Sequence, residues 1–463
     1  MLQRIAVLLL NLMLVGACAT TRKDGGDKTP APKADNAAST SASPRHTLIK
    51  AGRMLDVRSG SYQFDRGVLI EGERIKEVGP WAEVQSRAPK DARVIDLGAG
   101  MTLLPGLIDC HTHLLDLRKA NLEFYENNAR RLAQKSQEDH AKLGALTARE
   151  TVEAGWTTVR DLGDSANKSD LRLRDAIIAG QVVGPRMIVS ASKLTPPKGQ
   201  HIKPEAPVSE EIVKREYLLV NDLEAARRGV RAAADAGADV IKVIVDDGPL
   251  VLEPEIVKGI VEEAHRANLK VAAHAHVAAS IKIAVEAGAD SIEHAYQISD
   301  ESLRLMKEKG LFLVPTDITP EAVSELLAKS LPPGAAKRPE MEMYAREQVE
   351  LAPERLRRAL RIGVKIAAGS DLAWDWPGTT RGQQSLLIID AYRSAGMSPL
   401  DIIRAATLNA ADLLGWQDRI GVIEANKYAD VIAVEGDPLE NIADLKRVVF
   451  VLKGGVVLKE VNR

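Results

Sequence analysis

Leu104-Pro-Gly-Leu-Ile-Asp-Cys-His-Thr-His-Leu114 is the stretch that decides the fold of this chain. Pro105 and Gly106 mark a turn, and the apolar residues after them predict a buried strand. His111 and His113 stand two residues apart, so on a strand both imidazoles face the same side. Two convergent histidines on an apolar strand are typical of a metal site, although an isolated pair is more readily explained as hydrogen-bonded core residues. Ligands on later strands decide between these interpretations.

The composition is that of an ordinary globular protein. The 463 residues suffice for one large domain and a smaller one. A net charge of -2 and an aromatic content of 3% argue against a nucleic-acid partner, because neither a basic surface nor a base-stacking platform is indicated. Two cysteines, Cys18 and Cys110, provide no disulfide framework. Cys110 precedes His111 directly, so we expect it to face away from the histidines and to pack against helices.

Residues 1–18 are interpreted as a lipoprotein signal peptide. Arg4 supplies a positive start, and the apolar run over 5–15 is too short for an ordinary membrane span. Val15-Gly-Ala-Cys18 resembles a bacterial lipoprotein signal, which implies lipidation of Cys18 and a membrane attachment through that lipid. Ala19 then favours the outer membrane or a periplasm-facing position in the cell envelope. The alternative is a plain secretory signal and a secreted protein.

The chain after the signal divides into a tether, a long middle and two β-rich ends. Residues 19–46 are rich in Lys, Asp, Ala, Ser, Thr and Pro and predict a disordered tether. Residues 47–103 and 417–463 contain short apolar strands separated by turn residues. We therefore expect both ends to form one small β-sandwich domain beside an α/β domain over 104–416.

The middle alternates strand and helix patterns. Helical stretches over 223–236, 255–267 and 278–287 separate the strands, and Gly237 and Gly288 stand where helices end. Eight βα units that close on themselves form a TIM (β/α)8 barrel, in which catalytic groups lie at the C-terminal ends of the strands. The eight predicted strands are 107–114, 157–162, 186–190, 240–245, 270–276, 291–294, 312–315 and 365–371.

Strands 4, 5, 6 and 8 carry further groups suited to metal. Lys242 lies inside an apolar strand, where an unpaired cation is costly. His274 and His276 share one face of strand 5, His294 ends strand 6, and Asp371 ends strand 8. Each residue alone has an ordinary explanation, such as a helix cap or a hydrogen-bonded histidine. With the histidines of strand 1, a separate ordinary explanation would be needed on each of five strands. A shared metal site explains all five at once.

These motifs, in this order, resemble the amidohydrolase superfamily over nearly the whole chain after the tether. The resemblance is carried by PGLIDxHxH, Thr157-Thr-Val-Arg-Asp161, the strand-4 lysine, SIEH and the late Gly-Ser-Asp. Within the superfamily the chain is most similar to the branch of Xaa-Pro and Xaa-Arg dipeptidases and imidazolonepropionase-like proteins. A split small domain also fits that branch.

The resemblance implies a site for two divalent metal ions. His111 and His113 would bind the buried ion with Asp371, and His274 and His294 would bind the second ion. Lys242, carboxylated by carbon dioxide, would bridge both ions; the alternative is an ordinary lysine paired with a neighbouring acid. Zn²⁺ is the default for a site rich in histidine, and other divalent ions remain open.

The implied activity is metal-dependent hydrolysis of an amide C–N bond. A metal-bridging hydroxide would attack the carbonyl, and Asp371 would act as general base and pass the proton to the leaving amine. A dipeptide or an N-acyl amino acid is the expected substrate. The alternatives are a cyclic-amide hydrolase of the imidazolonepropionase kind, hydrolysis of lactones or phosphoesters, and a lipoprotein that binds metal or solute without catalysis.

The substrate side of the site is less well defined. His201, in the loop after strand 3, is a candidate for the substrate carboxylate or a solvated loop residue. His276 is a substrate contact or an inward group that supports the ligands. Arg381 is a candidate partner of a carboxylate. The neighbouring Trp374 and Trp376 line the substrate pocket or pack the loop. Asp161 is expected to be structural, and Asp246 and Asp247 either support the ligands from behind or are solvated. The oligomeric state, including a homo-oligomer, stays open.

Overall fold

The computed structural model describes residues 46–116, 118–119, 134–163, 168–198, 214, 216–330, 346–376 and 378–460. The signal peptide with Cys18, almost all of the predicted tether, and His201 lie outside these residues. Residues 43–463 form one compact unit. Within the part that the structure describes, no helix combines the length and the apolar character that a membrane crossing needs.

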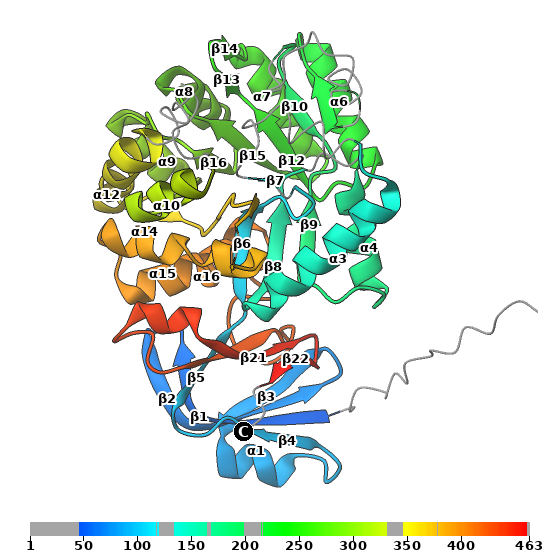
Figure 1. Cartoon of the computed structure of the whole chain (residues 1–463), viewed down its shortest axis with the longest axis vertical. Coiled ribbons are helices and arrows are strands. Elements are labelled where there is room, and N and C mark those ends of the chain that lie inside the picture. The colour runs from blue at the N-terminus through cyan, green and yellow to red at the C-terminus, as the bar shows by residue number, and fades with distance from the viewer. Residues whose placement is uncertain are drawn as a thin grey trace, which may run out of the picture. The chain divides into compact units, whose positions relative to one another are not determined.

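The β-rich ends of the chain form one mixed sheet with the order β22-β21-β20-β5-β1-β2-β3, and β4 pairs with β1 (Figure 1). Its assembly from both ends of the chain agrees with the prediction. The predicted β-sandwich is corrected, because the strands hydrogen-bond into a single sheet and not into two. The strands are β1 (His46–Asp56), β2 (Ser61–Glu71), β3 (Arg74–Pro80), β4 (Arg93–Asp96), β5 (Met101–Pro105), β20 (Val431–Glu435), β21 (Val448–Lys453) and β22 (Val456–Glu460).

β20 shows why this sheet stays attached to the α/β domain. Val431 and Ala433 pack in the core of the β domain, whereas Ile432 and Val434 belong to the large core that the barrel helices share. A strand that is buried on both faces needs a continuous apolar run, which is what the sequence provides here. On the other strands the short helix α1 (Trp81–Arg87) covers the sheet through Val84.

All eight predicted strands of the middle are present, and they run parallel. With two further strands, β10 and β11, they form a three-stranded sheet, β6-β8-β9, and a seven-stranded sheet, β11-β10-β12-β15-β16-β17-β18. The strands are β6 (Leu107–Thr112), β8 (Trp156–Asp161), β9 (Arg186–Val189), β10 (Lys193–Thr195), β11 (Tyr217–Leu219), β12 (Val240–Ile244), β15 (Lys270–Ala275), β16 (Ser291–His294), β17 (Phe312–Val314) and β18 (Lys365–Ile366). Two pairs of two-residue strands complete the list: β7 (Arg118–Lys119) pairs with β19 (Trp374–Asp375), and β13 (Asp246–Asp247) pairs with β14 (Leu250–Val251).

The strand ladders do not close into one ring within the described residues, so the continuous barrel of the prediction is resolved only as two sheets. A few backbone hydrogen bonds span the junctions. Between the first and last strands, Cys110 N–H donates to Ala368 O at 2.7 Å and Asp371 N–H donates to His111 O at 2.8 Å. Between β9 and β12, Asp239 N–H donates to Val189 O at 2.7 Å. The carboxylate of Asp109 accepts the N–H groups of His111 and Ser370 at 3.1 and 3.0 Å. A side chain thus replaces part of the ladder between the first and last strands.

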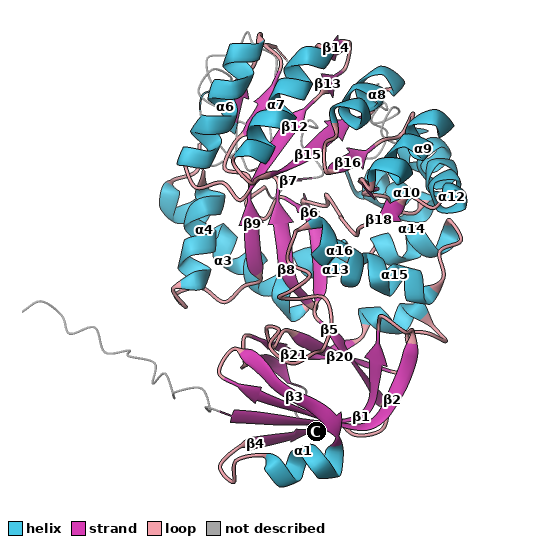
Figure 2. Cartoon of the chain, turned by 180° about the vertical axis from the view of Figure 1, so that it is seen from behind, coloured by secondary structure: helices cyan, strands magenta, loops and turns pink. Residues whose placement is uncertain are grey.

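Helices lie around the outside of the parallel strands (Figures 1 and 2). α6 shows the reason: Ala225, Ala226, Gly229, Val230 and Ala233 recur at helical spacing and are buried. Gly237 and Gly288 adopt φ of 93° and 81° after their helices, as their positions in the sequence predict.

The α-helices of this part are α3 (Gln137–Glu153), α4 (Ser169–Ile178), α6 (Leu223–Asp235), α7 (Pro254–Arg266), α8 (Ala278–Ala287), α9 (Asp300–Lys309), α10 (Pro320–Ser330), α12 (Ala352–Ile362), α13 (Arg381–Ser385), α14 (Ile388–Ser394), α15 (Pro399–Ala405) and α16 (Leu408–Leu413). A π-helix η1 (Glu347–Leu351) precedes α12, and a 3-10 helix η2 (Ile442–Lys446) lies between β20 and β21.

Candidate metal centre

The predicted ligands meet at the C-terminal ends of the parallel strands. Two groups have potential ligand atoms that all lie within 4.8 Å of one another. One group contains His111, His294 and Asp371, and the other contains His274, His276 and His294. His294 is common to both groups, so the two sets of donors form one continuous centre.

Three of the histidines have their Nδ1 atoms occupied by acceptors. Nδ1 of His111 lies 2.8 Å from a carboxylate oxygen of Glu293, and Nδ1 of His113 lies 2.5 Å from the carbonyl oxygen of Gly163. Nδ1 of His294 lies 2.8 Å from Oγ1 of Thr316, whose hydroxyl donates to the carbonyl of the preceding proline at 2.6 Å. Each acceptor holds the proton on Nδ1 and leaves the Nε2 lone pair free for a metal ion.

The Nε2 atoms of His111 and His113 lie close to Asp371 and Lys242. Oδ1 of Asp371 lies 3.2 Å from Nε2 of His113 and 3.8 Å from Nε2 of His111. Nζ of Lys242 lies 3.5 Å from Nε2 of His111. The Asp371 side chain is 29% exposed, whereas those of the two histidines are buried, so the carboxylate is the member of this group that solvent and a substrate can reach.

The backbone is strained where it presents these ligands. His294 and Asp371 have φ of 65° and 49°, and Ala295 and Thr316 have φ of 54° and 60°. Residues other than glycine adopt this region seldom, and such positions gather at functional sites. At His294 the conformation has a visible effect. It lets this side chain join the centre although the preceding Glu293 also points inward.

Glu293 and Arg160 form a buried pair under the centre that the sequence analysis did not single out. Nη2 of Arg160 donates to Oε1 of Glu293 at 2.8 Å, and both side chains are buried. Arg160 also donates to the carbonyl oxygen of Cys110 at 2.6 Å and to Oγ of Ser291 at 3.0 Å. Strand alternation, which puts Ser291 and Glu293 on one face, was the available indication of this role.

Burial favours the neutral forms of His111 and Lys242, whereas the adjacent Glu293 stays ionised. Burial, followed by the nearby Lys242, lowers the pKa of His111 to about 4, so its imidazole is neutral at pH 7. Burial also lowers the pKa of Lys242 to about 8, against the opposing effect of Glu293 and Asp371. Burial would raise the pKa of Glu293, but Arg160 and the hydrogen bond from His111 outweigh it and lower this pKa to about 2. The site therefore holds an amine that deprotonates readily beside a permanent carboxylate.

The residues proposed to contact substrate are placed unevenly. The Arg381 side chain is 2% exposed, and its Nη1 donates to Oγ of Ser385 at 2.6 Å. Trp374 and Trp376 are buried as well. In this structure the guanidinium of Arg381 is covered, so its contact with a substrate stays a prediction. His276, in contrast, lies beside the histidine cluster and is a quarter exposed.

Three further residues have structural positions. Cys110 is buried among apolar residues and is not paired, as expected. The carboxylate of Asp161 accepts from Oγ1 of Thr112 at 3.1 Å and from the N–H of Leu114 at 2.7 Å, which fixes the chain after β6. Asp246 is buried and accepts the N–H group of His276, so of its two expected roles the solvated one is wrong.

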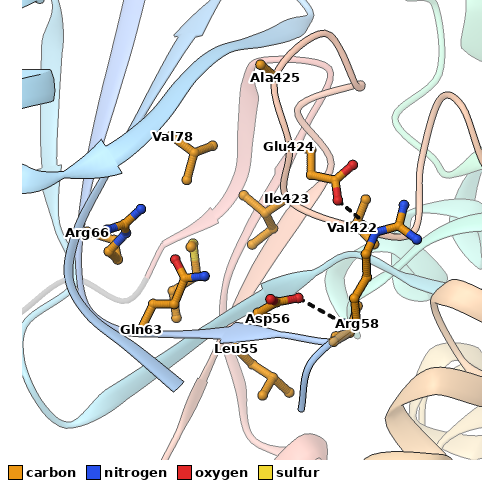
Figure 3. Close-up of a pocket in the computed structure, with 12 residues that line it drawn as sticks. Leu55, Asp56, Arg58, Gln63, Arg66, Val78, Val422, Ile423, Glu424 and Ala425 are labelled. Carbon is orange, nitrogen blue, oxygen red and sulfur yellow. Dashed lines mark hydrogen bonds and ion pairs between the residues drawn. The ribbon is translucent and has the colours of Figure 1, made fainter. Parts of the chain in front are cut away.

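A pocket of about 340 Å³ lies in the β domain, apart from these ligands (Figure 3). Three of its charged lining residues interact with one another. Nε of Arg58 donates to Glu424 at 2.8 Å, and the main-chain N–H of Arg58 donates to Asp56 at 2.9 Å. None of the predicted metal ligands lines this pocket, so it is not a candidate for the reaction site.

Comparison with known families agrees with the geometry. The model of the Amidohydrolase family matches residues 102–458, which include every predicted ligand. This chain belongs to the amidohydrolase family. A second model, the Imidazolonepropionase-like composite domain of bacteria, matches residues 67–90 of the β domain of this amidohydrolase. The resemblance inferred from the sequence motifs is thereby confirmed.

Similar proteins cover most of this amidohydrolase. It is 34% identical to an ochratoxinase of Aspergillus niger, over 89% of this chain and 86% of that protein. It is 28% identical to an imidazolonepropionase of Pseudomonas fluorescens, over 86% of this chain and 94% of that protein. A crystal structure of a Xaa-Pro dipeptidase with bound methionine in the active site matches with a TM-score of 0.74 and 30% identity, over 89% of this chain and 99% of that one.

Proposed function

We propose that this amidohydrolase holds two divalent metal ions and hydrolyses an amide C–N bond of a dipeptide or an N-acyl amino acid. The observation that carries the proposal is the convergence of imidazole Nε2 atoms on one carboxylate and one buried amine. His111, His113 and Asp371 would hold the buried ion, and His274 and His294 would hold the second. The arrangement of these residues fits two metal ions. The Nδ1 atoms of His111, His113 and His294 are hydrogen-bonded to groups outside the centre, which leaves Nε2 of each for an ion.

Lys242 would bridge the two ions as a carbamate. Carboxylation requires a neutral amine, and burial brings the pKa of Lys242 down to about 8. The modification would replace a buried cation by an anion with two oxygen donors, which removes the cost of an unpaired lysine. Its position, 3.5 Å from Nε2 of His111, lies within the cluster of ligands.

Asp371 would move the proton. Bound divalent ions lower the pKa of a water molecule and polarise a carbonyl group. The carboxylate of Asp371 lies among the ligands and is partly exposed, so it can accept a proton from the attacking water and deliver it to the leaving amine. The strained φ of 49° fixes where this carboxylate is presented.

The names of similar proteins support the substrate class. The solved relatives include the Xaa-Pro dipeptidase and a prolidase complexed with N-methylphosphonate-L-proline, which matches with a TM-score of 0.75 and 28% identity. A second candidate is hydrolysis of a cyclic amide, favoured by the match of residues 67–90 and by the imidazolonepropionase relatives.

A substrate panel tests the proposal. Purified protein is assayed on Xaa-Pro and Xaa-Arg dipeptides, N-acyl amino acids and cyclic amides, before and after metal removal by a chelator. We expect amide hydrolysis that chelation abolishes and added Zn²⁺ restores, and no turnover by Asp371→Asn. Bound metal without hydrolysis of any compound would favour a metal-binding or solute-binding protein instead, and substantial activity of Asp371→Asn would reject its role.

We also propose attachment to the cell envelope through a lipid on Cys18. The support is the apolar run that ends in Val15-Gly-Ala-Cys18. Metabolic labelling with a fatty-acid analogue should mark the unaltered protein and leave Cys18→Ser unmarked. Equal labelling of both proteins, or release of the unaltered protein as a secreted chain, would contradict this attachment.

A further inference from the structure

We infer that His276 is a third imidazole ligand of the second metal ion, with Glu347 as the residue that positions it. The inference rests on the two-ion site proposed above and extends it, because only His274 and His294 are assigned to that ion there. It also replaces the two roles that the sequence left open for His276.

The backbone of His276 is held in place on three sides. Its N–H group donates to both carboxylate oxygens of Asp246, at 3.0 and 3.1 Å, and the N–H of Val277 donates to the same carboxylate at 2.9 Å. The N–H of Gln297 donates to the carbonyl oxygen of His276 at 3.0 Å. Asp246 is buried and follows β12, so it ties the end of β15 to the neighbouring strand. A residue fixed in this way presents its side chain at a defined point.

The imidazole of His276 belongs to the cluster at that point. Its ring centroid lies 4.3 Å from that of His274 and 4.9 Å from that of His294. The three residues offer ligand atoms within 4.8 Å of one another. Zn–N bonds of about 2.0–2.1 Å keep tetrahedral donors about 3.3 Å apart, so these atoms need to approach by about 1.5 Å at most to share one ion.

Glu347 completes the pattern seen at the other histidines. It is the first residue of the π-helix η1, and its Oε1 lies 3.8 Å from Nδ1 of His276. The Glu347 side chain is 11% exposed, so this carboxyl group is partly shielded from solvent next to the imidazole. A shift of about 1 Å turns the ion-pair distance into a hydrogen bond. The proton of His276 would then stay on Nδ1, and Nε2 would face the second ion, as at His111 with Glu293.

The third imidazole has a chemical consequence for the choice of metal. Three imidazole nitrogens and a carbamate oxygen would be a nitrogen-rich donor set, which suits Zn²⁺, Co²⁺ and related ions and disfavours Mg²⁺ and Ca²⁺. The attacking hydroxide would be a fifth ligand of the second ion. The second site is therefore expected to select ions that prefer nitrogen donors. The first site has a carboxylate oxygen donor from Asp371 and should be less selective.

Metal binding by the full-length protein and its variants tests the inference. The protein is loaded with Zn²⁺ or Co²⁺, metal content is measured by mass spectrometry, and affinity is measured by competition with a chromophoric chelator. We expect two ions in the unaltered protein and one retained ion in His276→Ala, whose affinity for the second ion falls by more than the about 10–100-fold typical of losing a supporting partner. The d–d absorption of the Co²⁺ protein should lose the contribution of the second site.

Glu347→Gln provides the second variant. It should weaken the second ion by about 10–100-fold and leave the first unchanged. Glu350→Gln, three residues further in the same π-helix and exposed, and His265→Ala, which removes an exposed histidine, are matched controls that should bind both ions normally. Circular dichroism verifies folding, and His276→Gln replaces His276→Ala if the latter does not fold.

The outcomes separate the inference from the proposal on which it rests. Two ions in the His276 variant, with unchanged affinity and an unchanged Co²⁺ spectrum, would overturn the role of His276 and leave the two-ion site standing. A normal second ion in Glu347→Gln, together with its loss in His276→Ala, would remove only the positioning role of Glu347. An unaltered protein that binds fewer than two ions would overturn both proposals.

Discussion

Replacement of Glu293 by Gln should weaken both the fold and the metal centre. Glu293 accepts from Arg160 at 2.8 Å and lies 2.8 Å from Nδ1 of His111, in a region without solvent exposure. The substitution keeps the shape but leaves the Arg160 cation without its counter-charge. Removal of one partner from a buried ion pair costs about 3–5 kcal/mol.

The pH dependence of the unfolding free energy gives a second estimate of what Glu293 contributes to stability. The folded protein lowers the pKa of Glu293 from 4.5 to about 2, with burial opposing the shift and Arg160 as the main cause of it. A carboxyl group whose pKa is lowered by folding stabilises the protein above its unfolded pKa, and the contribution disappears as the pH falls from about 4.5 toward 2. The difference corresponds to about 3 kcal/mol.

Urea unfolding of the chelator-treated proteins measures this contribution without interference from bound metal. With an m value of roughly 3 kcal/mol per M, the midpoint of Glu293→Gln should fall by about 1 M at pH 7. Between pH 4.5 and 2 the variant should also lose about 3 kcal/mol less stability than the unaltered protein, because only the contribution of Glu293 is missing. Glu424→Gln, which breaks the half-exposed pair with Arg58, is the matched control and should change stability by about 1 kcal/mol or less.

The amide of the variant would also disturb His111. A Gln Nε2 donor facing Nδ1 would favour the imidazole tautomer with its proton on Nε2, so metal affinity should fall by about 10–100-fold. If Glu293→Gln matched Glu424→Gln in its midpoint and bound metal normally, the buried pair would not support the centre and the reasoning would be wrong.

Three further predictions address other parts of the account. Thr316→Val should leave Nδ1–H of His294 without its acceptor and weaken metal binding by about 10–100-fold, measured by chelator competition; normal affinity would refute this role. After equilibration with ¹³C-labelled bicarbonate, the unaltered protein should show a carbamate carbon signal by NMR that Lys242→Arg lacks, and its absence from both would reject carboxylation. Gly106→Ala would place a Cβ 2.1 Å from a hydroxyl oxygen on β8 and should destabilise the protein by about 1–3 kcal/mol in thermal unfolding, whereas Gly100→Ala, with open space around its Cβ, should be tolerated.

The strands of the α/β domain could be predicted because their sequence patterns are strong. Apolar runs bounded by turn residues located all eight, and positive φ at Gly237 and Gly288 agrees with the predicted helix ends. The way in which the strands close could not be read from these patterns. At the junction of the first and last strands, the carboxylate of Asp109 replaces part of the backbone pairing, and a side-chain bond of this kind leaves no periodic pattern.

The convergence of the candidate metal ligands was predictable to the extent that strand alternation holds. His111 with His113 and His274 with His276 lie two residues apart, and each pair converges as expected. The supporting groups were harder to predict. Alternation places Glu293 and His294 on opposite faces, yet both reach the centre because His294 adopts a left-handed conformation.

Glu347 shows a different limit. It belongs to a π-helix more than 70 residues after His276 in the chain, and the ion pair between them depends on how helix and strand pack. A single acid in a helical segment is usually solvated, so no local pattern distinguishes Glu347 from the exposed Glu350 nearby. The three-dimensional contact was needed to connect it with the site.

The most direct test of the central claim is a crystal structure of the metal-loaded protein with anomalous diffraction at the absorption edge of the bound ion. The account predicts two anomalous peaks about 3.5–4 Å apart, one beside His111, His113 and Asp371 and the other beside His274 and His294, with Lys242 between them. A single peak, or peaks away from these side chains, would contradict it.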